Sequence, residues 1–131
     1  VVEDGPTVTH GGMPFGAGTV AARQGGAAEL VDPRPFAVGS LADTFGRYPH
    51  LTGVLPAMGY SPDQLDDLAR TIAAVPCDVV VTGTPIDLSR LIDIPQPVRH
   101  ATYTLAEIGS PTLASVLAPW SERWTGSAGR R

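Results

Sequence analysis

The stretch that decides the fold is Asp78-Val79-Val80-Val81-Thr82-Gly83. Three consecutive valines between an acid and a glycine are typical of a short buried strand. Upstream, Ser61-Pro62-Asp63-Gln64 has the pattern of a helix start, with a serine N-cap, a proline in the first turn and a glutamine that completes a capping box. Apolar residues then recur at helical spacing as far as Val75. A capped helix followed at once by a buried strand indicates a parallel α/β fold.

The rest of the chain continues this alternation of helices and strands. Strands are predicted at residues 1–3, 28–31 and 54–55, with an extended edge segment at 98–105. Helices are predicted at 19–24, ended by Gly25-Gly26, at 40–48 with Ser40 as N-cap, and after Ser110-Pro111 with an apolar face. That face comprises Leu113, Val116, Leu117 and Trp120. The sequence therefore predicts a mostly parallel sheet flanked by helices over residues 1–120, followed by a disordered tail at 121–131.

Composition excludes several classes of protein. The net charge of −4 argues against a nucleic-acid partner. No apolar run approaches the roughly 18 residues of a membrane-spanning helix. Cys77 is the single cysteine, so an internal disulfide is impossible and a cytoplasmic location is expected. All nine basic residues are arginine, so this chain cannot supply a phosphate-binding or catalytic lysine. Because Val1 falls inside a predicted strand, we expect that an N-terminal portion is missing.

The first candidate loop runs from Glu3 to Gly18 and contains five glycines. Loops that follow the strands of an open parallel sheet are the usual ligand sites. Backbone amides at Gly11, Gly12 and Gly16, together with Thr7, are therefore predicted to bind a substrate phosphate. A long solvated turn is an equally weighted interpretation.

Titratable side chains in and after this loop are the candidates for catalysis. His10 is predicted to donate a proton to a phosphate, and Glu3 or Asp4 to bind a metal or act as a base. Arg34 lies between Pro33 and Pro35, which stiffen its backbone and favour bidentate phosphate binding. His10 and Arg34 are predicted to converge on one cleft at the C-terminal edge of the sheet. The alternative for Arg34 is a surface ion pair with Asp32.

A third loop, Thr82 to Leu88, follows the valine-rich strand directly. The Thr84 hydroxyl and the Asp87 carboxylate are predicted to contact a nucleotide there. An ordinary strand-to-helix turn capped by Asp87 is the alternative interpretation.

Several long blocks carry a resemblance to a known family. They include Val2-Glu3-Asp4-Gly5-Pro6-Thr7, Thr9-His10-Gly11-Gly12-Met13-Pro14, Gly16-Ala17-Gly18, Val31-Asp32-Pro33-Arg34-Pro35, Val54-Leu55-Pro56-Ala57-Met58-Gly59-Tyr60 and Gly83-Thr84-Pro85-Ile86-Asp87-Leu88. In this order they resemble the predicted GTPases related to cyclic 2,3-diphosphoglycerate synthetase. The resemblance runs from Val1 to about Leu117.

The resemblance implies the C-terminal part of a three-layer, P-loop NTPase-like domain, whose phosphate-binding loop lies upstream of this chain. It implies a nucleotide-dependent, phosphoryl-transferring enzyme that uses ATP or GTP with Mg²⁺ and acts on a small phosphorylated metabolite. The expected partner is the missing N-terminal P-loop portion, and a homo-oligomer is compatible with the sequence. The isolated chain is predicted to be inactive. A non-catalytic domain that binds a phosphometabolite, or a fragment with no independent role, is the alternative.

Overall fold

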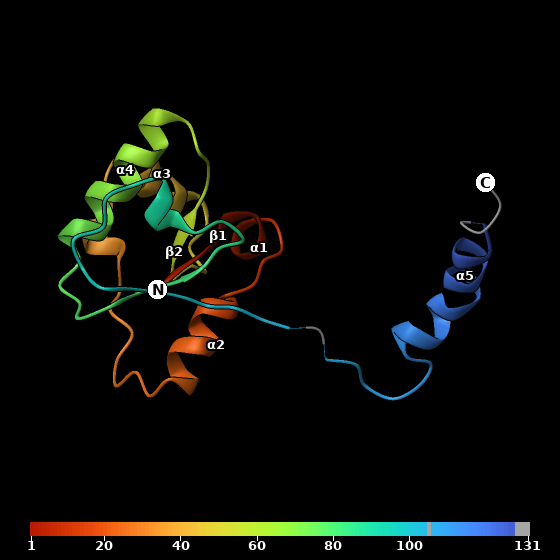
Figure 1. Ribbon diagram of the computed structural model, residues 1–131. Coiled ribbons are helices and arrows are strands. Elements are labelled where there is room, and N and C mark those ends of the chain that lie inside the picture. The colour runs from red at the N-terminus through yellow and green to blue at the C-terminus, as the bar shows by residue number, and fades with distance from the viewer. Residues whose placement is uncertain (105, 128–131) are drawn as a thin grey trace.

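The computed structural model describes residues 1–104 and 106–127, and the main chain alone from residue 122 onward. A four-stranded sheet in the order β2-β1-β3-β4, parallel throughout, forms its centre (Figure 1). This confirms the predicted α/β class. The elements in chain order are β1 (Val2–Asp4), α1 (Gly5–Thr9), α2 (Ala17–Gln24), the 3-10 helix η1 (Arg34–Phe36), α3 (Gly39–Arg47), β2 (Leu55–Ala57), α4 (Pro62–Ala74), β3 (Val80–Gly83), the 3-10 helix η2 (Leu88–Arg90), β4 (Val98–His100) and α5 (Leu113–Ser127).

The valine-rich stretch forms the strand that the sequence predicts. β3 pairs with β1 on one side and with β4 on the other. Val80 is buried, whereas Val79 is 41% exposed because it precedes the ladder. Before β3, the predicted capping box at Ser61 and Gln64 opens α4. The strand predicted at Val79–Val81, next to Val1-Val2 or Leu30-Val31, is therefore confirmed beside β1, although Val79 precedes it and Val81 is only half-buried.

Alternation along the strands places helices on both faces of the sheet. Val2 and Val80 face a core cluster that includes Leu68 and Ile72 of α4. The next residue of β1, Glu3, faces the opposite way and bonds to the backbone of α2. Figure 1 shows α2 on one side of the strands and α3 with α4 on the other.

Two local predictions are wrong. Residues 28–31 do not form a strand, because the segment pairs with none of the four strands, although the outer edges of β2 and β4 are not occupied by another described strand. Part of the predicted glycine-rich loop is helical, since Asp4 caps α1 by accepting hydrogen bonds from the Thr7 amide and hydroxyl. The helix predicted at residues 19–24 begins earlier, at Ala17, and ends at the predicted Gly25-Gly26 turn.

The start of α3 is capped by another helix and not by its own residues. Ser40, predicted as the N-cap, lies inside the first turn, and Val38 occupies the cap position without a side-chain bond. Asp67 of α4 accepts hydrogen bonds from the Ser40 amide and hydroxyl, both at 2.8 Å. The backbone bond from Ser40, and then its hydroxyl, lower the pKa of Asp67 below its ordinary value of 3.8.

This cap predicts a pH-dependent stability. Since the folded-state pKa of Asp67 is depressed, its contribution to stability is present above pH 3.8 and is lost as the pH falls through the folded value. We expect Asp67→Asn to lower the free energy of unfolding at neutral pH. The deficit should shrink as the wild type is titrated below pH 3.8. Urea unfolding as a function of pH measures both, and a deficit independent of pH would contradict the prediction.

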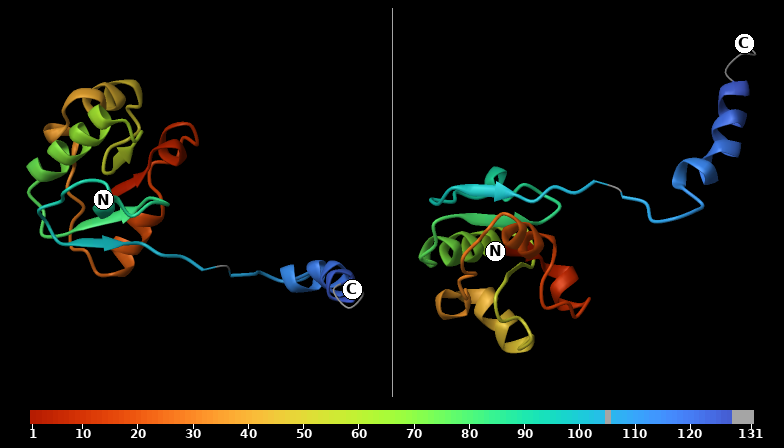
Figure 2. Two further views of the ribbon diagram at one scale, coloured as in Figure 1. Left: turned by 45° about the horizontal axis from the view of Figure 1, so that its top comes forward. Right: turned by 90° about the horizontal axis from the view of Figure 1, so that it is seen from below.

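Helix α5 does not bury the apolar face that its sequence predicts. Leu113, Val116 and Leu117 are each about half exposed, and Trp120 is 63% exposed. The helix lies apart from the α/β unit at the end of an extended segment (Figure 2). It also runs to Ser127, through part of the stretch predicted to be a disordered tail, and the rest of that stretch lies outside the described residues. Within the described part of the chain, no helix has the length and apolarity needed to cross a membrane.

Candidate functional site

The most buried charged group at the sheet edge is the carboxylate of Glu3, which is 1% exposed. One oxygen, Oε1, accepts hydrogen bonds from the amides of Gly16 at 3.0 Å and Thr19 at 2.7 Å. The other, Oε2, accepts from the amide of Gly18 at 3.0 Å. The carboxylate therefore occupies the positive end of α2. A side chain of this protein fills the place where the glycine-rich sequence predicts a bound phosphate.

The glycines around Glu3 allow this close approach of helix and sheet. A Cβ added at Gly16 would lie 2.7 Å from Glu3 Oε2. A Cβ added at Gly83 of β3 would lie 2.4 Å from both Glu3 Oε2 and the backbone nitrogen of Gly18. The glycines at these positions are thus required by packing, and Gly16, predicted to bind phosphate, donates its amide to Glu3.

A cavity of about 190 Å³ lies at the carboxyl ends of β1 and β3. Glu3, Asp4 and Thr7 border it on one side and Gly16 at the start of α2 on another. Tyr103, which follows β4 and is 73% exposed, adds an aromatic wall. This is the edge at which parallel sheets bind ligands, so we take this cavity as the candidate functional site.

Of the two carboxylates that border this cavity, Asp4 is the one that does not cap α2. Its Oδ2 accepts the Thr7 amide at 3.3 Å and the Thr7 hydroxyl at 2.7 Å. Its Oδ1 accepts no hydrogen bond from the residues that the structure describes. The residue as a whole is half-buried at the rim of the cavity.

The segment from His10 to Gly12, also in the first predicted loop, uses its backbone amides to end α1. The amides of His10 and Gly11 both donate to Pro6 O, and the amide of Gly12 donates to Thr9 O. These bonds close the C-terminal end of α1, so neither glycine has a free amide for a phosphate oxygen. The predicted phosphate contacts of Gly11 and Gly12 thus have no geometric support.

His10 is exposed and packs at the surface against Tyr48. The two rings meet edge to face with centroids 6.1 Å apart, and the His50 ring contacts Tyr48 edge to face at the same centroid separation. The Nε2 of His50 donates to Val8 O at 2.7 Å, which sets its tautomer. His10 does not line the cavity at the sheet edge, so its predicted role as a proton donor there stays a prediction.

Arg34 forms the surface ion pair that was the alternative to phosphate binding. Its Nε and Nη2 donate to the Asp32 carboxylate at distances between 2.5 and 2.9 Å. The hydrogen bond from Arg34 lowers the pKa of Asp32. Arg34 follows no strand, since residues 28–31 form none, and it does not line the cavity that Asp4 borders. The predicted convergence of His10 and Arg34 on one cleft therefore loses its structural basis.

The loop after β3 is the strand-to-helix turn that was the alternative there. Thr84 is buried and donates its hydroxyl to Ile86 O at 2.6 Å. Asp87 caps η2 by accepting from the Ser89 amide and hydroxyl, and the hydroxyl bond is the main cause of its lowered pKa. Both side chains are thus engaged locally, and their predicted nucleotide contacts stay predictions.

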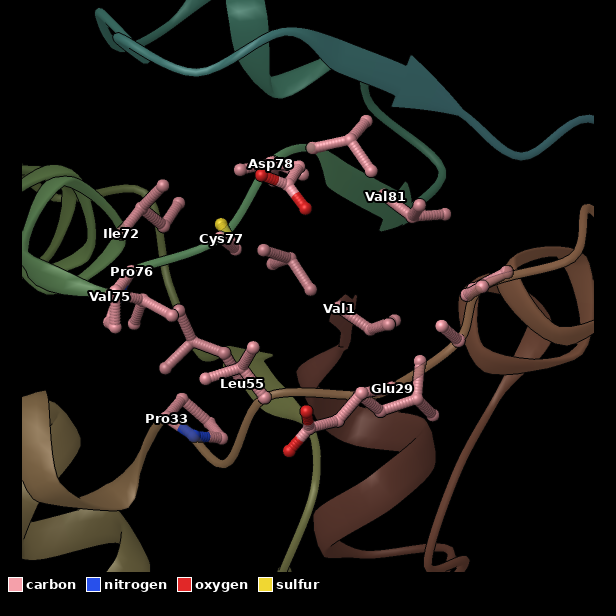
Figure 3. Close-up of a pocket in the computed structure, with 18 residues that line it drawn as sticks. Val1, Glu29, Pro33, Leu55, Ile72, Val75, Pro76, Cys77, Asp78 and Val81 are labelled. Carbon is pink, nitrogen blue, oxygen red and sulfur yellow. The ribbon is translucent and has the colours of Figure 1, made fainter.

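A larger cavity, of about 580 Å³, lies at the opposite edge of the sheet (Figure 3). Aliphatic side chains such as Val1, Leu55 and Ile72 surround it, with the Cys77 thiol and Asp78 on one side. Its polar lining side chains are Glu29, Cys77 and Asp78, and it lies at the amino ends of the strands. Because ligands of parallel sheets bind at the carboxyl ends of the strands, we place the candidate site at the smaller cavity.

Of the predicted site residues, the structure brings Glu3, Asp4, Thr7 and Gly16 together at this cavity. Tyr103 was missed because a lone tyrosine after an edge strand carries no sequence signal. The capping role of Glu3 was also missed, although an acid one helix upstream of a glycine-flanked helix start is a usable hint. No three His, Cys, Asp or Glu residues among residues 1–104 and 106–127 are grouped as metal ligands.

Comparison with known proteins finds sequence similarity to a synthetase. No protein-family model matches the sequence, and no solved structure matches it either. The chain is similar to "Arginine synthetase ArcE" of Thermococcus kodakarensis, with 53% identity over 122 residues. The match covers 93% of this chain but 27% of that protein. The chain therefore spans about a quarter of the length of its curated relative, and over nearly all of its own length it is similar to part of an arginine synthetase.

Proposed function

We propose that this chain is part of a nucleotide-dependent synthetase that forms arginine or a closely related guanidino acid. The observation that carries the proposal is the 53% identity to arginine synthetase ArcE across 93% of the chain. The polar cavity at the carboxyl edge of the parallel sheet supports it, because such edges bind ligands in α/β enzymes.

The chemistry of the product favours a phosphoryl-transfer step. A guanidino group differs from a ureido group by a nitrogen in place of the oxygen, and that oxygen is a poor leaving group. Transfer of the γ-phosphoryl group from ATP or GTP to the ureido oxygen would release the nucleoside diphosphate. Ammonia would then add at the same carbon, and phosphate would leave with the oxygen. This course agrees with the phosphoryl transfer that the family resemblance implies.

The nucleotide phosphates need contacts from outside this chain. It contains no lysine, and Arg34, the arginine predicted to bind phosphate, is paired with Asp32. A P-loop in the remainder of the enzyme would supply these contacts, with Mg²⁺ arriving on the nucleotide. In this proposal Asp4, Thr7 and Tyr103 lie on the substrate side, and the loop of Thr84 and Asp87 lies nearer the nucleotide.

A segment exchange tests the proposal. We expect the isolated chain to hydrolyse neither ATP nor GTP, because it lacks a phosphate-binding loop and its lysine. We expect a chimera, in which this chain replaces the matching segment of arginine synthetase ArcE, to form arginine from a ureido acid, ammonia and ATP or GTP. Chromatographic detection of arginine and of released phosphate measures both.

The controls make the outcome decisive. Omitting ammonia should abolish arginine formation by the chimera. A chimera that folds, as judged by circular dichroism, but forms no arginine would contradict the proposal. Robust nucleotide hydrolysis by the isolated chain, abolished by a substitution within it, would contradict the division of roles between this segment and the rest of the enzyme.

A further inference from the structure

We propose that the cavity at the carboxyl ends of β1 and β3 binds the guanidinium group of the amino acid, between the Asp4 carboxylate and the Tyr103 ring. The inference rests on the proposed function for its substrate class and deepens it by assigning the group that this cavity holds. It replaces the phosphate that the glycine-rich sequence predicts here.

The charge of the cavity favours a cation. Two carboxylates, Glu3 and Asp4, are among its lining residues, whereas none of the lining residues is arginine, lysine or histidine. The Glu3 carboxylate is used by the amides of α2, and it neutralises the positive helix terminus that would otherwise attract an anion. A free phosphate would therefore meet like charge, whereas a cation would be attracted.

The available acceptor suits a hydrogen-bonding cation. Both bonds that Asp4 accepts from Thr7 end on Oδ2, so Oδ1 is open to a ligand. A guanidinium donates charge-assisted hydrogen bonds to such an oxygen. A metal ion would need further ligands, and no group of three or more metal-binding side chains occurs among the residues that the structure describes.

The shape of the cavity suits a flat cation. Tyr103 borders it with an aromatic ring that is largely free of protein contacts, at 73% exposure. Guanidinium groups stack on aromatic faces and are more weakly hydrated than ammonium groups. The volume of about 190 Å³ accommodates a guanidinium and the first part of an aliphatic chain, with the rest of the amino acid outside.

Binding of n-propylguanidinium to the isolated chain tests this assignment. We expect saturable shifts of the backbone amide resonances of Asp4, Ala17 and Gly83 in heteronuclear NMR titrations, with a millimolar dissociation constant. The uncharged n-propylurea should bind at least about tenfold more weakly, because it lacks the charge. Separate titrations with inorganic phosphate and with Mg²⁺ test whether the cavity prefers an anion or a metal ion.

Variants identify the residues. Asp4→Asn should weaken n-propylguanidinium binding about tenfold while keeping the cap of α1, since asparagine is also a good N-cap. Tyr103→Leu, at an exposed position, should weaken it about threefold. Asp43→Asn, which removes an exposed carboxylate of α3, should leave binding unchanged.

Each outcome decides the inference. No saturable binding, equal binding of propylurea, or preferential binding of phosphate or Mg²⁺ through Asp4 would overturn it. If the chimera forms arginine but the cavity binds no guanidinium, the inference fails and the proposed function stands. If the cavity binds guanidinium but the chimera is inactive, the proposed function fails and the binding site stands.

Discussion

Glu3→Ala is expected to lower the free energy of unfolding by about 3 kcal/mol or more, because each buried amide left without a partner costs about 1–3 kcal/mol. The substitution would orphan the amides of Gly16, Gly18 and Thr19 at the start of α2. It would also leave a void where a side chain is 1% exposed. Urea unfolding followed by circular dichroism measures the loss, and hydrogen exchange at Gly18 and Thr19 should accelerate more than exchange in α4.

Two further variants separate the capping role from general loss of charge. Glu3→Gln keeps the shape but offers one acceptor oxygen, so the amide group would face a backbone donor, and an intermediate loss of about 1–3 kcal/mol is expected. Glu29→Gln removes an exposed carboxylate and should be nearly neutral. A loss for Glu3→Gln no larger than that for Glu29→Gln would show that the Glu3 carboxylate does not cap α2.

Gly83→Ala is the second substitution with a large expected effect. The added methyl group would lie 2.4 Å from Glu3 Oε2 and from the backbone nitrogen of Gly18. Neither group can move at low cost, since the Glu3 carboxylate as a whole is held by three hydrogen bonds and the Gly18 nitrogen is backbone. We expect a loss of about 3 kcal/mol in unfolding free energy, at the upper end of the range for overpacked cores.

Gly46→Ala is the matched control for this substitution. Gly46 lies inside α3, and a Cβ there would meet nothing within 4 Å. Alanine should therefore stabilise the protein by about 0.5–1 kcal/mol through its higher helix propensity. Thermal unfolding of the two variants side by side measures the contrast. A neutral Gly83→Ala variant would mean that α2 does not approach the sheet as closely as described.

Local patterns predicted the elements whose stability is local. The capping box at Ser61, the valine run of β3 and the Gly25-Gly26 turn were all identified correctly. Prediction failed for a segment whose structure depends on pairing with a distant strand. Residues 28–31 have strand-like composition, but a strand needs a partner to pair with, and composition carries no information about whether a segment lies against a sheet edge.

The candidate site shows the same division. The sequence placed its first candidate site in the loop after β1, and Asp4, Thr7 and Gly16 border a cavity there. It predicted a bound phosphate, because a glycine-rich helix start is typical of phosphate binding when nothing else fills it. In the structure the Glu3 carboxylate occupies that helix start. That Glu3 fills it depends on the side-chain direction of β1 relative to α2, which only the assembled sheet sets.

Taken alone, the sequence determined the parallel α/β class, the capped helix α4, the central strand β3 and the absence of any lysine. Only the tertiary structure decided that Glu3 caps α2 and that the apolar face of α5 lies exposed. The physical reason is the separation along the sequence over which each kind of interaction acts. Propensity, capping and periodicity act between residues a few positions apart, whereas the partner of a buried charge or an apolar face is chosen by segments brought together from 13 or more residues away, as for Glu3 and Gly16.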